Sequence, residues 1–399
     1  MGLPSSFDRR ILVAACGMTP QIVTETLYAL RVAASDSFAV NEIRLVTTTD
    51  GKKQAVKLCV GGHMERLCKE YGFEDVSFDP SCIEVIRDAA GNELSDIREP
   101  EHNRLAADCI TDLIRRLTAD DSAAIHVSLA GGRKTMGYYI GYALSLYGRS
   151  QDRLSHVLVS EGFEGHPEFY FPTQESRMIT TAAGRSLDTH EAVVTLAEIP
   201  FVRLRDTLPP RLLAERTSFS EAVRWSSLDE EPVRLEIDLR ERTLRASGEL
   251  VVLSPVLLAF YTMFARAARD EDGDIEARDS NLHLTRSFAA ELARCHGVAD
   301  TDSGSFEGLL KQMEDDVDRR ILDALRRTGT VNGTLRHLGI GKQYLEPKVS
   351  ELGRVLEQEL GSRMASIYRV HKRGRLGKGK GSIPLYGLAL EPSQITIRD

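Results

Sequence analysis

The segment Gly131-Gly132-Arg133-Lys134-Thr135-Met136 has the residue types of an anion site. Two consecutive glycines let the backbone approach a ligand closely and expose neighbouring N–H groups. An apolar run precedes the segment and a helix-like run follows it, so a positive helix N-terminus would add to the charges of Arg133 and Lys134. The Walker spacing is missing, so nothing indicates a nucleoside triphosphatase. The segment predicts a phosphate site, and the alternative is a helix-starting turn with two solvated cations.

Two further turns place polar residues directly after an apolar run. In Gly17-Met18-Thr19-Pro20-Gln21, the glycine permits a tight turn and Pro20 suits the first position of a helix. Thr19 offers a hydroxyl to a ligand, and it could equally serve as a plain N-cap. The second turn is Thr47-Thr48-Thr49-Asp50. Its side chains would contact ribose or adenine edges in a ligand site, and otherwise they are ordinary polar residues at a strand end.

The elements that must position these turns alternate between strand-like and helix-like segments. We expect strands at residues 10–16, 42–48, 76–78, 83–86, 123–129 and 154–159, and helices at 22–34, 52–71, 102–117 and 134–147. This alternation predicts an α/β, Rossmann-like fold whose mostly parallel sheet is covered on both faces. Ligands bind such sheets at the carboxyl ends of the strands. All three turns lie at such ends, and their agreement is a stronger argument than any one turn.

The second half of the chain has a different pattern. We expect a connecting helix at 209–225, a β-hairpin or small meander at 233–253, and helices at 256–268, 288–295, 306–327 and 345–360. Strands are expected at 366–370 and 385–390, on either side of a basic, glycine-rich segment. This order predicts a winged helix-turn-helix-like α+β domain. The predicted organisation is one domain at 1–205, a connecting helix or linker at 206–230, and a second domain at 231–399.

The basic segment would form the wing of that second domain. Its cations could lie along the phosphate backbone of DNA; they are Lys372, Arg373, Arg375, Lys378 and Lys380. The alternative is a solvated loop. The helix expected before it carries four glutamates, which argues against its use as a recognition helix; they are Glu346, Glu351, Glu357 and Glu359.

Composition restricts the class of protein. The formal net charge is −8, so the whole chain is not a basic nucleic-acid coat. Six cysteines include no Cys-x-x-Cys pair and no histidine lies at zinc spacing, so we expect a reducing compartment and no metal or cofactor. The apolar run at residues 11–16 is too short for a signal peptide or a membrane span, which favours a cytoplasmic protein with no membrane partner. His126 lies in mid-strand, where a core histidine is the better interpretation.

Two segments carry a resemblance to a known family. They resemble proteins with the CRISPR-associated Rossmann fold (CARF). The segments are ILVAACGMTPQIVTETLYAL at residues 11–30 and HVSLAGGRKTMG at 126–137, with LSHVLV at 154–159 downstream. Within that superfamily the chain is similar to the ring nucleases of type III systems over about residues 10 to 200. The second half matches only the general pattern of a winged helix.

The resemblance implies a homodimer with one symmetric pocket for cyclic oligoadenylate, a ring of four or six AMP units, and we expect cyclic tetra-adenylate. It further implies cleavage without a metal, in which a ribose 2′-OH attacks the adjacent phosphodiester and leaves a 2′,3′-cyclic phosphate. The catalytic lysine of the family falls on Lys134 and its Ser or Thr on Thr19. The implied ligand-binding residues are Gly17, Met18, Thr19, Gln21, Thr48, Thr49, Asp50, Gly131, Gly132, Arg133, Lys134, Thr135 and Met136.

Three functions remain open on these grounds. The first is a ring nuclease that switches off the antiviral signal. The second is a non-catalytic sensor that regulates transcription through the second domain. The third is a ligand-activated ribonuclease, because Arg278-Asp-Ser-Asn-Leu-His283 fits the loose Arg-x4-His pattern of the HEPN ribonucleases. With ten histidines in the chain, such a match is expected by chance. Many CARF proteins carry an effector ribonuclease after the first domain, and none is recognisable here.

Overall fold

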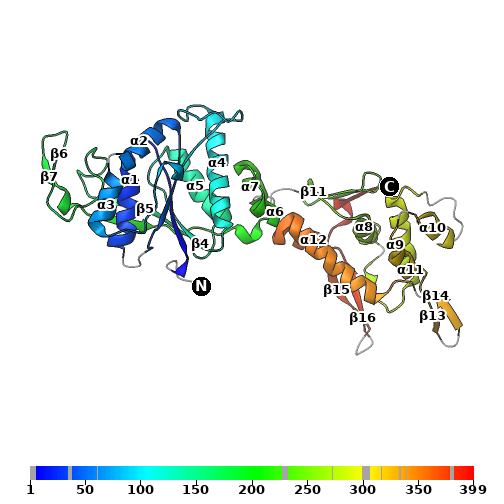
Figure 1. Cartoon of the computed structure of the whole chain (residues 1–399). Coiled ribbons are helices and arrows are strands. Elements are labelled where there is room, and N and C mark those ends of the chain that lie inside the picture. The colour runs from blue at the N-terminus through cyan, green and yellow to red at the C-terminus, as the bar shows by residue number, and fades with distance from the viewer. Residues whose placement is uncertain are drawn as a thin grey trace. The chain divides into compact units, whose positions relative to one another are not determined.

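The computed structural model describes residues 6–34, 38–60, 62–226, 232–271, 273–298, 306–315, 317–331, 334–337, 339–377 and 382–399. The chain forms two compact units (Figure 1). The first unit comprises Met1–Asp206 and Leu212–Trp225, and the second comprises Thr207–Arg211 and Ser226–Asp399. None of the helices in the described ranges is long and apolar enough to span a bilayer.

The first unit is built on a six-stranded sheet in the order β3-β2-β1-β4-β5-β8. Its strands are β1 Arg9–Ala15, β2 Glu42–Thr47, β3 Ile83–Val85, β4 Ala123–Ser128, β5 Arg153–Val159 and β8 Val194–Glu198. The first five pair in parallel, and β8 runs antiparallel to β5. β1 and β4 are almost wholly buried, as strands covered on both faces must be. The predicted α/β fold with a mostly parallel sheet is confirmed.

Helices flank this sheet (Figure 1). They are α1 Gln21–Tyr28, which continues as a π-helical turn over Ala29–Ala33, α2 Thr49–Val60, α3 His63–Tyr71, α4 Pro100–Thr118 and α5 Lys134–Tyr147. The single helix predicted at 52–71 is wrong: Gly62 has φ +67°, which no continuous right-handed helix accommodates, and it separates α2 from α3. Short 3-10 helices lie at Pro80–Cys82, Thr189–Glu191, Arg205–Thr207 and Pro392–Gln394.

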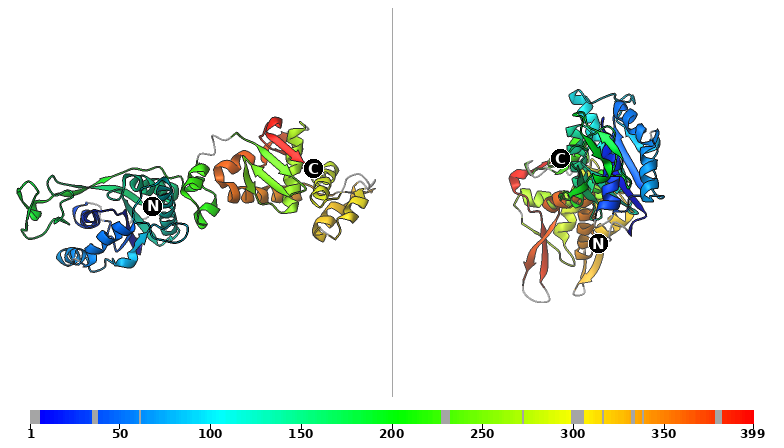
Figure 2. Two further views of the ribbon diagram at one scale, coloured as in Figure 1. Left: turned by 90° about the horizontal axis from the view of Figure 1, so that it is seen from above. Right: turned by 90° about the vertical axis from the view of Figure 1, so that its left-hand side faces the viewer.

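A hairpin and two short helices complete the first half of the chain. The hairpin strands are β6 Met178–Thr180 and β7 Ser186–Asp188, and they lie at one end of the first unit (Figures 1 and 2). The single helix predicted at 209–225 is wrong, because the structure has α6 Pro210–Ala214 and α7 Phe219–Ser226. Ser218 explains the break: its hydroxyl accepts from the Glu221 N–H at 3.1 Å and so caps a new helix.

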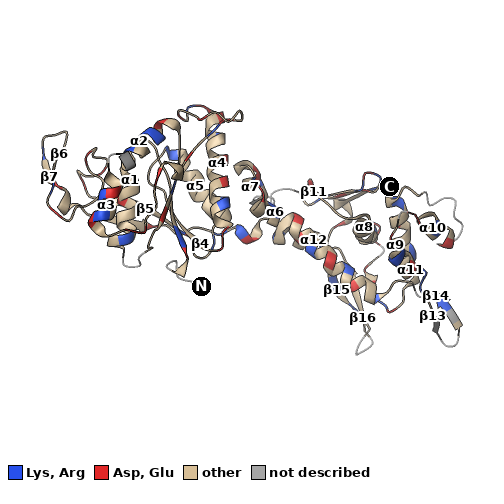
Figure 3. Ribbon diagram, in the orientation of Figure 1, with Lys and Arg blue, Asp and Glu red and all other residues tan. Residues whose placement is uncertain are grey.

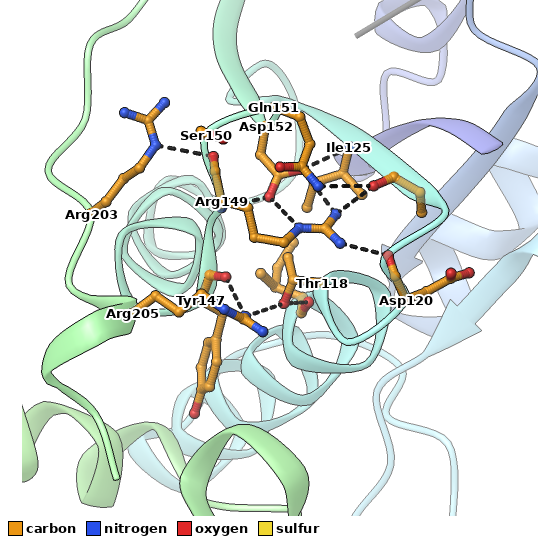
Figure 4. Close-up of polar contacts among 12 residues, drawn as sticks. Thr118, Asp120, Ile125, Tyr147, Arg149, Ser150, Gln151, Asp152, Arg203 and Arg205 are labelled. Atoms are coloured by element: carbon orange, nitrogen blue, oxygen red, sulfur yellow. Dashed lines mark hydrogen bonds and ion pairs between the residues drawn. The ribbon is translucent and has the colours of Figure 1, made fainter. Parts of the chain in front are cut away.

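A buried ion pair fixes the amino ends of β4 and β5 (Figure 4). Asp152 is fully buried and accepts from the N–H groups of Ile125 and Arg149 at 3.0 and 2.7 Å. The Arg149 guanidinium donates to Asp152 and to the carbonyls of Asp120 and Ala123. Buried charges need partners of this kind to offset their loss of hydration. The pair therefore anchors the amino ends of these strands, at the end of the sheet opposite to the three polar turns.

His126 is a core residue, as the sequence indicated. It is 2% exposed, and its Nε2 lies 2.7 Å from the Ser155 hydroxyl on the neighbouring strand. Burial lowers its pKa to about 3. The imidazole is therefore neutral at physiological pH and serves packing between β4 and β5.

The second unit contains a four-stranded sheet in the order β11-β10-β9-β17, with β17 parallel to β9. Its strands are β9 Leu235–Asp238, β10 Thr243–Ala246, β11 Glu249–Val251 and β17 Ile395–Arg398. Its helices are α8 Pro255–Arg269, α9 Leu282–Cys295, α10 Phe306–Gln312, α11 Arg319–Arg326 and α12 Lys342–Tyr368. The predicted meander and the predicted cap of α8 are present, since the Ser254 hydroxyl accepts from the Leu257 N–H at 3.3 Å.

Two predictions for this unit are wrong. The helix expected at 306–327 is divided into α10 and α11, and Asp318 caps the start of the second. Residues 366–368 of the strand expected at 366–370 are the last residues of α12, where Tyr368 is fully buried and its carbonyl accepts from the Tyr261 hydroxyl at 2.6 Å. α12 itself is interrupted at Gly361, where φ is +72°.

The first part of the basic segment, His371–Leu376, is a strand. β15 His371–Leu376 carries Lys372, Arg373 and Arg375 and pairs with β16 Ile383–Gly387, which also pairs with β12 Ile275–Glu276. Figures 1 and 2 show this hairpin projecting from its unit. Lys378 and Lys380 lie outside the described residues. A second hairpin is formed by β13 Thr328–Val331 and β14 Thr334–His337.

Candidate anion site at the carboxyl ends of the parallel strands

The three polar turns meet at one edge of the sheet because β2, β1 and β4 are neighbours. The turn after β1 touches the turn after β4: a Cβ placed at Gly17 would lie 3.2 Å from the Cα of Gly132. The turn after β2 is tied to the first by the Thr47 hydroxyl, which donates to the Cys16 carbonyl at 2.5 Å. The sheet thus brings together residues that lie more than 80 positions apart in the chain.

The turn after β4 requires its two glycines. Gly131 and Gly132 have φ values of +92° and +69°, in the left-handed region that other residues rarely adopt. A Cβ at Gly131 would lie 2.8 Å from the Ala15 carbonyl oxygen and 2.9 Å from the Ile22 side chain. The backbone therefore approaches β1 and α1 as closely as a glycine allows.

This turn leaves the N-terminus of α5 uncapped. The N-cap residue Arg133 makes no side-chain cap. Among the described residues, no acceptor faces the N–H groups of Gly132, Arg133, Lys134 and Thr135, and the first bonded group of the helix is the Met136 N–H. Free donors at the positive end of a helix are a general means of binding an anion.

The two cations of the turn differ in their surroundings. Arg133 donates from Nε to Asp96 Oδ1 at 2.8 Å and makes a second bond from its terminal nitrogen. The Asp96 carboxylate also accepts from Arg98, and these contacts, with that to Arg133 the largest, hold its pKa far below the ordinary range. Lys134 is exposed and makes no ion pair with any residue that the structure describes. The charge of Lys134 is therefore the one still available to a ligand.

Asp96 is a site residue that the sequence patterns did not indicate. It lies in the loop that follows β3, which is also a strand end at this edge of the sheet. The pattern that bears on Asp96 is the strand expected at 83–86, since polar residues that follow this strand lie near the carboxyl ends of the sheet. The ion pair with Arg133 spans 37 positions of sequence and has no local signature.

An open hollow of ≈ 880 Å³ lies beside the turn. Its walls are residues 97–100, Asn103 of α4 and residues 132–135. The Asn103 amide donates to the Tyr139 hydroxyl, which joins the start of α4 to α5. The first turns of both helices therefore border the same space, and Lys134 stands at its rim.

The turn after β1 presents side chains to solvent. Met18 is 66% exposed, and Thr19 is exposed. The alternative role of Thr19 as an N-cap is wrong, because Pro20 occupies that position and α1 has no side-chain cap. Gln21 is buried, and its Oε1 has no hydrogen-bond partner in the described part of the chain. The Thr19 hydroxyl is thus available to a ligand at the same edge as Lys134.

The turn after β2 is largely committed to the protein. Thr48 is 9% exposed. The N–H groups of Thr49 and Asp50 donate to the carbonyls of Leu94 and Ser95 at 2.8 and 3.4 Å, so the start of α2 is covered by the loop after β3. The groups of this turn that remain toward solvent are the Thr49 side chain and the Asp50 carboxylate, the latter bonded to Lys53 at 2.8 Å.

Thr135 and Met136 face in opposite directions. Thr135 is exposed and lines the hollow. Met136 is 2% exposed, and its sulfur would lie 3.2 Å from a Cβ at Gly132. Met136 therefore supports the turn from beneath, whereas Thr135 lies on the ligand side.

In the second unit, the basic residues on β15 also differ from one another. Arg373 pairs with Asp274 at 3.4 Å and donates to the Leu388 carbonyl at 2.6 Å. Lys372 and Arg375 are exposed and have no ion pair within the described ranges. Figure 3 shows both acidic and basic residues along α12. The hairpin thus offers two uncommitted cations beside a helix of mixed charge.

Arg278 and His283 line one pocket of ≈ 490 Å³ in the second unit. Arg278 forms an ion pair with Glu276, which lies two positions earlier in the chain. His283 is exposed near the start of α9. Asn281 between them caps that helix through the Leu284 N–H at 3.0 Å. In the described residues of both units, no group of three or more His, Cys, Asp or Glu side chains is arranged to hold a metal ion.

Residues 19–230, more than half of the chain, match the family model of the CRISPR-associated protein NE0113. The chain belongs to this CRISPR-associated family. The part shared with the NE0113 family runs from Thr19 through the turn after β2 and the Gly-Gly-Arg-Lys turn to the end of the first unit. No curated protein matches the chain.

Proposed function

We propose that this member of the NE0113 family is a type III CRISPR ring nuclease that binds and cleaves cyclic oligoadenylate, with cyclic tetra-adenylate as the ligand. The proposal rests on one observation above the others: an uncapped helix N-terminus and the uncommitted Lys134 lie at a strand edge that also carries the free hydroxyl side chain of Thr19. Family membership supplies the CRISPR context. In this proposal the first unit is a CARF domain and the second a winged helix.

Binding would use two copies of the chain. A homodimer with two-fold symmetry presents the same edge twice, which matches the symmetry of a ring of identical nucleotides. The N–H groups from Gly132 to Thr135 would donate to non-bridging phosphate oxygens, and Lys134 would add its positive charge. Thr49 and Asp50 at the neighbouring turn would face ribose or adenine.

Cleavage would proceed by attack of a ribose 2′-OH on the adjacent phosphorus, with departure of the 5′-oxygen and formation of a 2′,3′-cyclic phosphate. The attacking 2′-oxygen, the phosphorus and the departing 5′-oxygen must be held in line, so positioning supplies most of the rate enhancement. Lys134 and the N–H groups of the turn would stabilise the added negative charge on the phosphorane, and Thr19 would orient the 2′-OH. With no general base assigned, we expect a turnover at or below about 1 s⁻¹.

The test is a single-turnover reaction in EDTA. The full chain in excess is mixed with radiolabelled cyclic tetra-adenylate, and the expected product is linear with a 2′,3′-cyclic phosphate. Lys134→Ala should slow the reaction by about 10²- to 10³-fold, as loss of one donor to a developing oxyanion does. Lys57→Ala, which removes an exposed lysine of α2, is the matched control and should leave the rate unchanged. A ring that stays intact in the presence of excess wild-type protein rules out cleavage.

A second candidate function is regulation of transcription through DNA binding. The observation in its favour is the pair of exposed, uncommitted cations Lys372 and Arg375 on the β15–β16 hairpin. If they contact phosphates, replacing either by alanine should weaken DNA binding and reduce the salt slope by about one. Binding is measured by gel retardation over a salt series, with and without cyclic tetra-adenylate. An unchanged slope in both variants would exclude this role for the hairpin.

A further inference from the structure

A second cluster of cations lies on the first unit, away from the strand edge described above. Arg66 and Lys69 of α3 and Arg177, which directly precedes β6, line a pocket of ≈ 630 Å³ together with Glu70 and residues 173–176. Figure 1 shows α3 and the β6–β7 hairpin on the same side of the first unit. This pocket shares no residue with the hollow beside Lys134.

The three cations have no acidic partner. None of Arg66, Lys69 and Arg177 makes an ion pair with a residue in the described ranges, although most arginines of the first unit do. Nε of Arg66 is buried without a hydrogen-bond acceptor. A buried donor without an acceptor is costly, and more so when it belongs to a charged group. The pocket lining therefore contains a buried donor, Nε of Arg66, that the described protein atoms leave unsatisfied.

The nearest carboxylate is used elsewhere. Glu70 accepts from the backbone N–H of Gln174, which fastens the segment before β6 to α3. Glu175 also lines the pocket and is exposed. Neither carboxylate makes an ion pair with the three cations, and three cations against two carboxylates give the pocket lining a formal charge of +1.

The Arg66 side chain packs on an aromatic ring. The Arg66 guanidinium lies over the Phe171 ring, 5.1 Å from its centroid, and Phe171 is itself buried. Burial and then the like charge of Arg177 lower the pKa of Arg66, and the charge of Glu70 opposes this change. The same two guanidinium groups act on His63, which stacks on Tyr170 at 3.6 Å, and with burial they lower its pKa.

We propose that this pocket binds a phosphate-bearing small molecule, whose phosphate lies between Arg66 and Arg177 and within reach of Lys69. A phosphate would accept from the unsatisfied guanidinium donors and neutralise the repulsion between them, and planar guanidinium groups match its oxygens in pairs. The volume is that of an ordinary small-molecule site. Free phosphate and the phosphate of a nucleotide share this chemistry. The site is separate from the proposed ring nuclease site and does not depend on it.

The test is calorimetric titration of the full chain with inorganic phosphate and, separately, with AMP, at constant ionic strength. Both probes should bind, and Arg66→Gln and Arg177→Gln should each weaken binding by about 10-fold or more. Arg185→Gln, an exposed arginine in the β6–β7 turn outside the pocket, is the matched control and should bind as the wild type does. Tighter binding of AMP assigns the site to a nucleotide, and equal binding assigns it to free phosphate.

Lys134→Gln separates this site from the strand edge. If phosphate binds in the proposed pocket, that variant keeps its affinity, and loss of binding in Lys134→Gln with retention in Arg66→Gln overturns the proposal. Thermal melting gives a second readout, since phosphate should raise the Tm of the wild type by more than that of Arg177→Gln. Without phosphate, Arg177→Gln should melt no lower than the wild type, because it removes a repelling charge. Failure of both probes to bind the wild type also overturns the proposal.

Discussion

Arg133 Nε lies 2.8 Å from Asp96 Oδ1, and this contact makes two adjacent cations of one turn unequal. In the sequence, Arg133 and Lys134 offer the same charge to an anion. In the folded chain, Arg133 forms an ion pair with the carboxylate of Asp96, which also accepts from Arg98, whereas Lys134 has no ion-pair partner among the described residues. Lys134 should therefore contribute more to ligand binding than Arg133.

The first prediction compares these two positions directly. Lys134→Gln should weaken the binding of cyclic tetra-adenylate by about 10-fold or more, as loss of a charge-assisted hydrogen bond does. Arg133→Gln should weaken it by less than about 3-fold, because its charge is already paired. Affinity is measured by calorimetry at one salt concentration. Equal losses in the two variants would contradict the assignment.

The second prediction concerns Asp96 itself. In Asp96→Asn the guanidinium of Arg133 is released, so the ligand should bind more tightly at low salt and lose that gain at high salt. In this background, Arg133→Gln should become costly, and the double-mutant cycle measures the coupling. Asp96→Asn should lower the free energy of unfolding by no more than about 1 kcal/mol, since Arg133 is half exposed. Additive effects of the two substitutions would show that the pair has no role in binding.

The third prediction concerns the shape of the turn. Gly131→Ala should destabilise the chain by about 1–3 kcal/mol and weaken ligand binding, because φ is +92° and the new Cβ would press on the Ala15 carbonyl. Gly137→Ala is the matched control within α5. Its Cβ would meet the Leu129 carbonyl at an ordinary 3.5 Å, so it should be neutral or slightly stabilising. Urea unfolding monitored by circular dichroism measures both, and a neutral Gly131→Ala would argue against the strain.

The fourth prediction concerns Glu25 on α1, which is 4% exposed. Burial, and then the charge of Glu164, raise its pKa to about 8. The folded state therefore holds a proton that the unfolded chain releases above about pH 4.5. The free energy of unfolding therefore has its full value below about pH 4.5. It falls by roughly 3–5 kcal/mol as the pH rises to 8.

Glu25→Gln removes this titration. Its free energy of unfolding should match the wild type near pH 4.5 and exceed it increasingly towards pH 8, as followed by urea unfolding at several pH values. Glu65→Gln, an exposed position on α3, serves as the control and should keep the wild-type profile. A Glu25→Gln variant with the wild-type slope between pH 5 and 8 would contradict the prediction.

The fifth prediction concerns the buried ion pair at the opposite edge of the sheet (Figure 4). Asp152→Asn leaves the Arg149 side chain, which is 8% exposed, without its carboxylate. The expected loss in the free energy of unfolding is about 3–5 kcal/mol, far above that for Asp96→Asn. Chemical denaturation of the two variants side by side tests the difference, and similar losses would contradict it.

Local patterns in the sequence were sufficient for much of the first unit. An apolar run that ends in glycine or threonine, followed by a periodic segment, indicates a strand, a turn and a helix without any tertiary contact. The α/β class, the turns after β1, β2 and β4, and the core position of His126 follow from such patterns. The same patterns failed where a helix was interrupted, at Gly62 and at Ser218, because a single conformational or capping contact decides those boundaries.

The tertiary structure decided which residues meet. The strand order places the turns of β2, β1 and β4 side by side, and it adds Asp96 from the loop after β3. It also gives Arg133 an ion pair that Lys134 does not make, turns Met136 into the core, and gathers Arg66 and Arg177 from segments more than 100 positions apart. Periodicity within a segment reports only which face is buried, whereas the pairing of strands and ions depends on contacts distant in sequence, which no local pattern encodes.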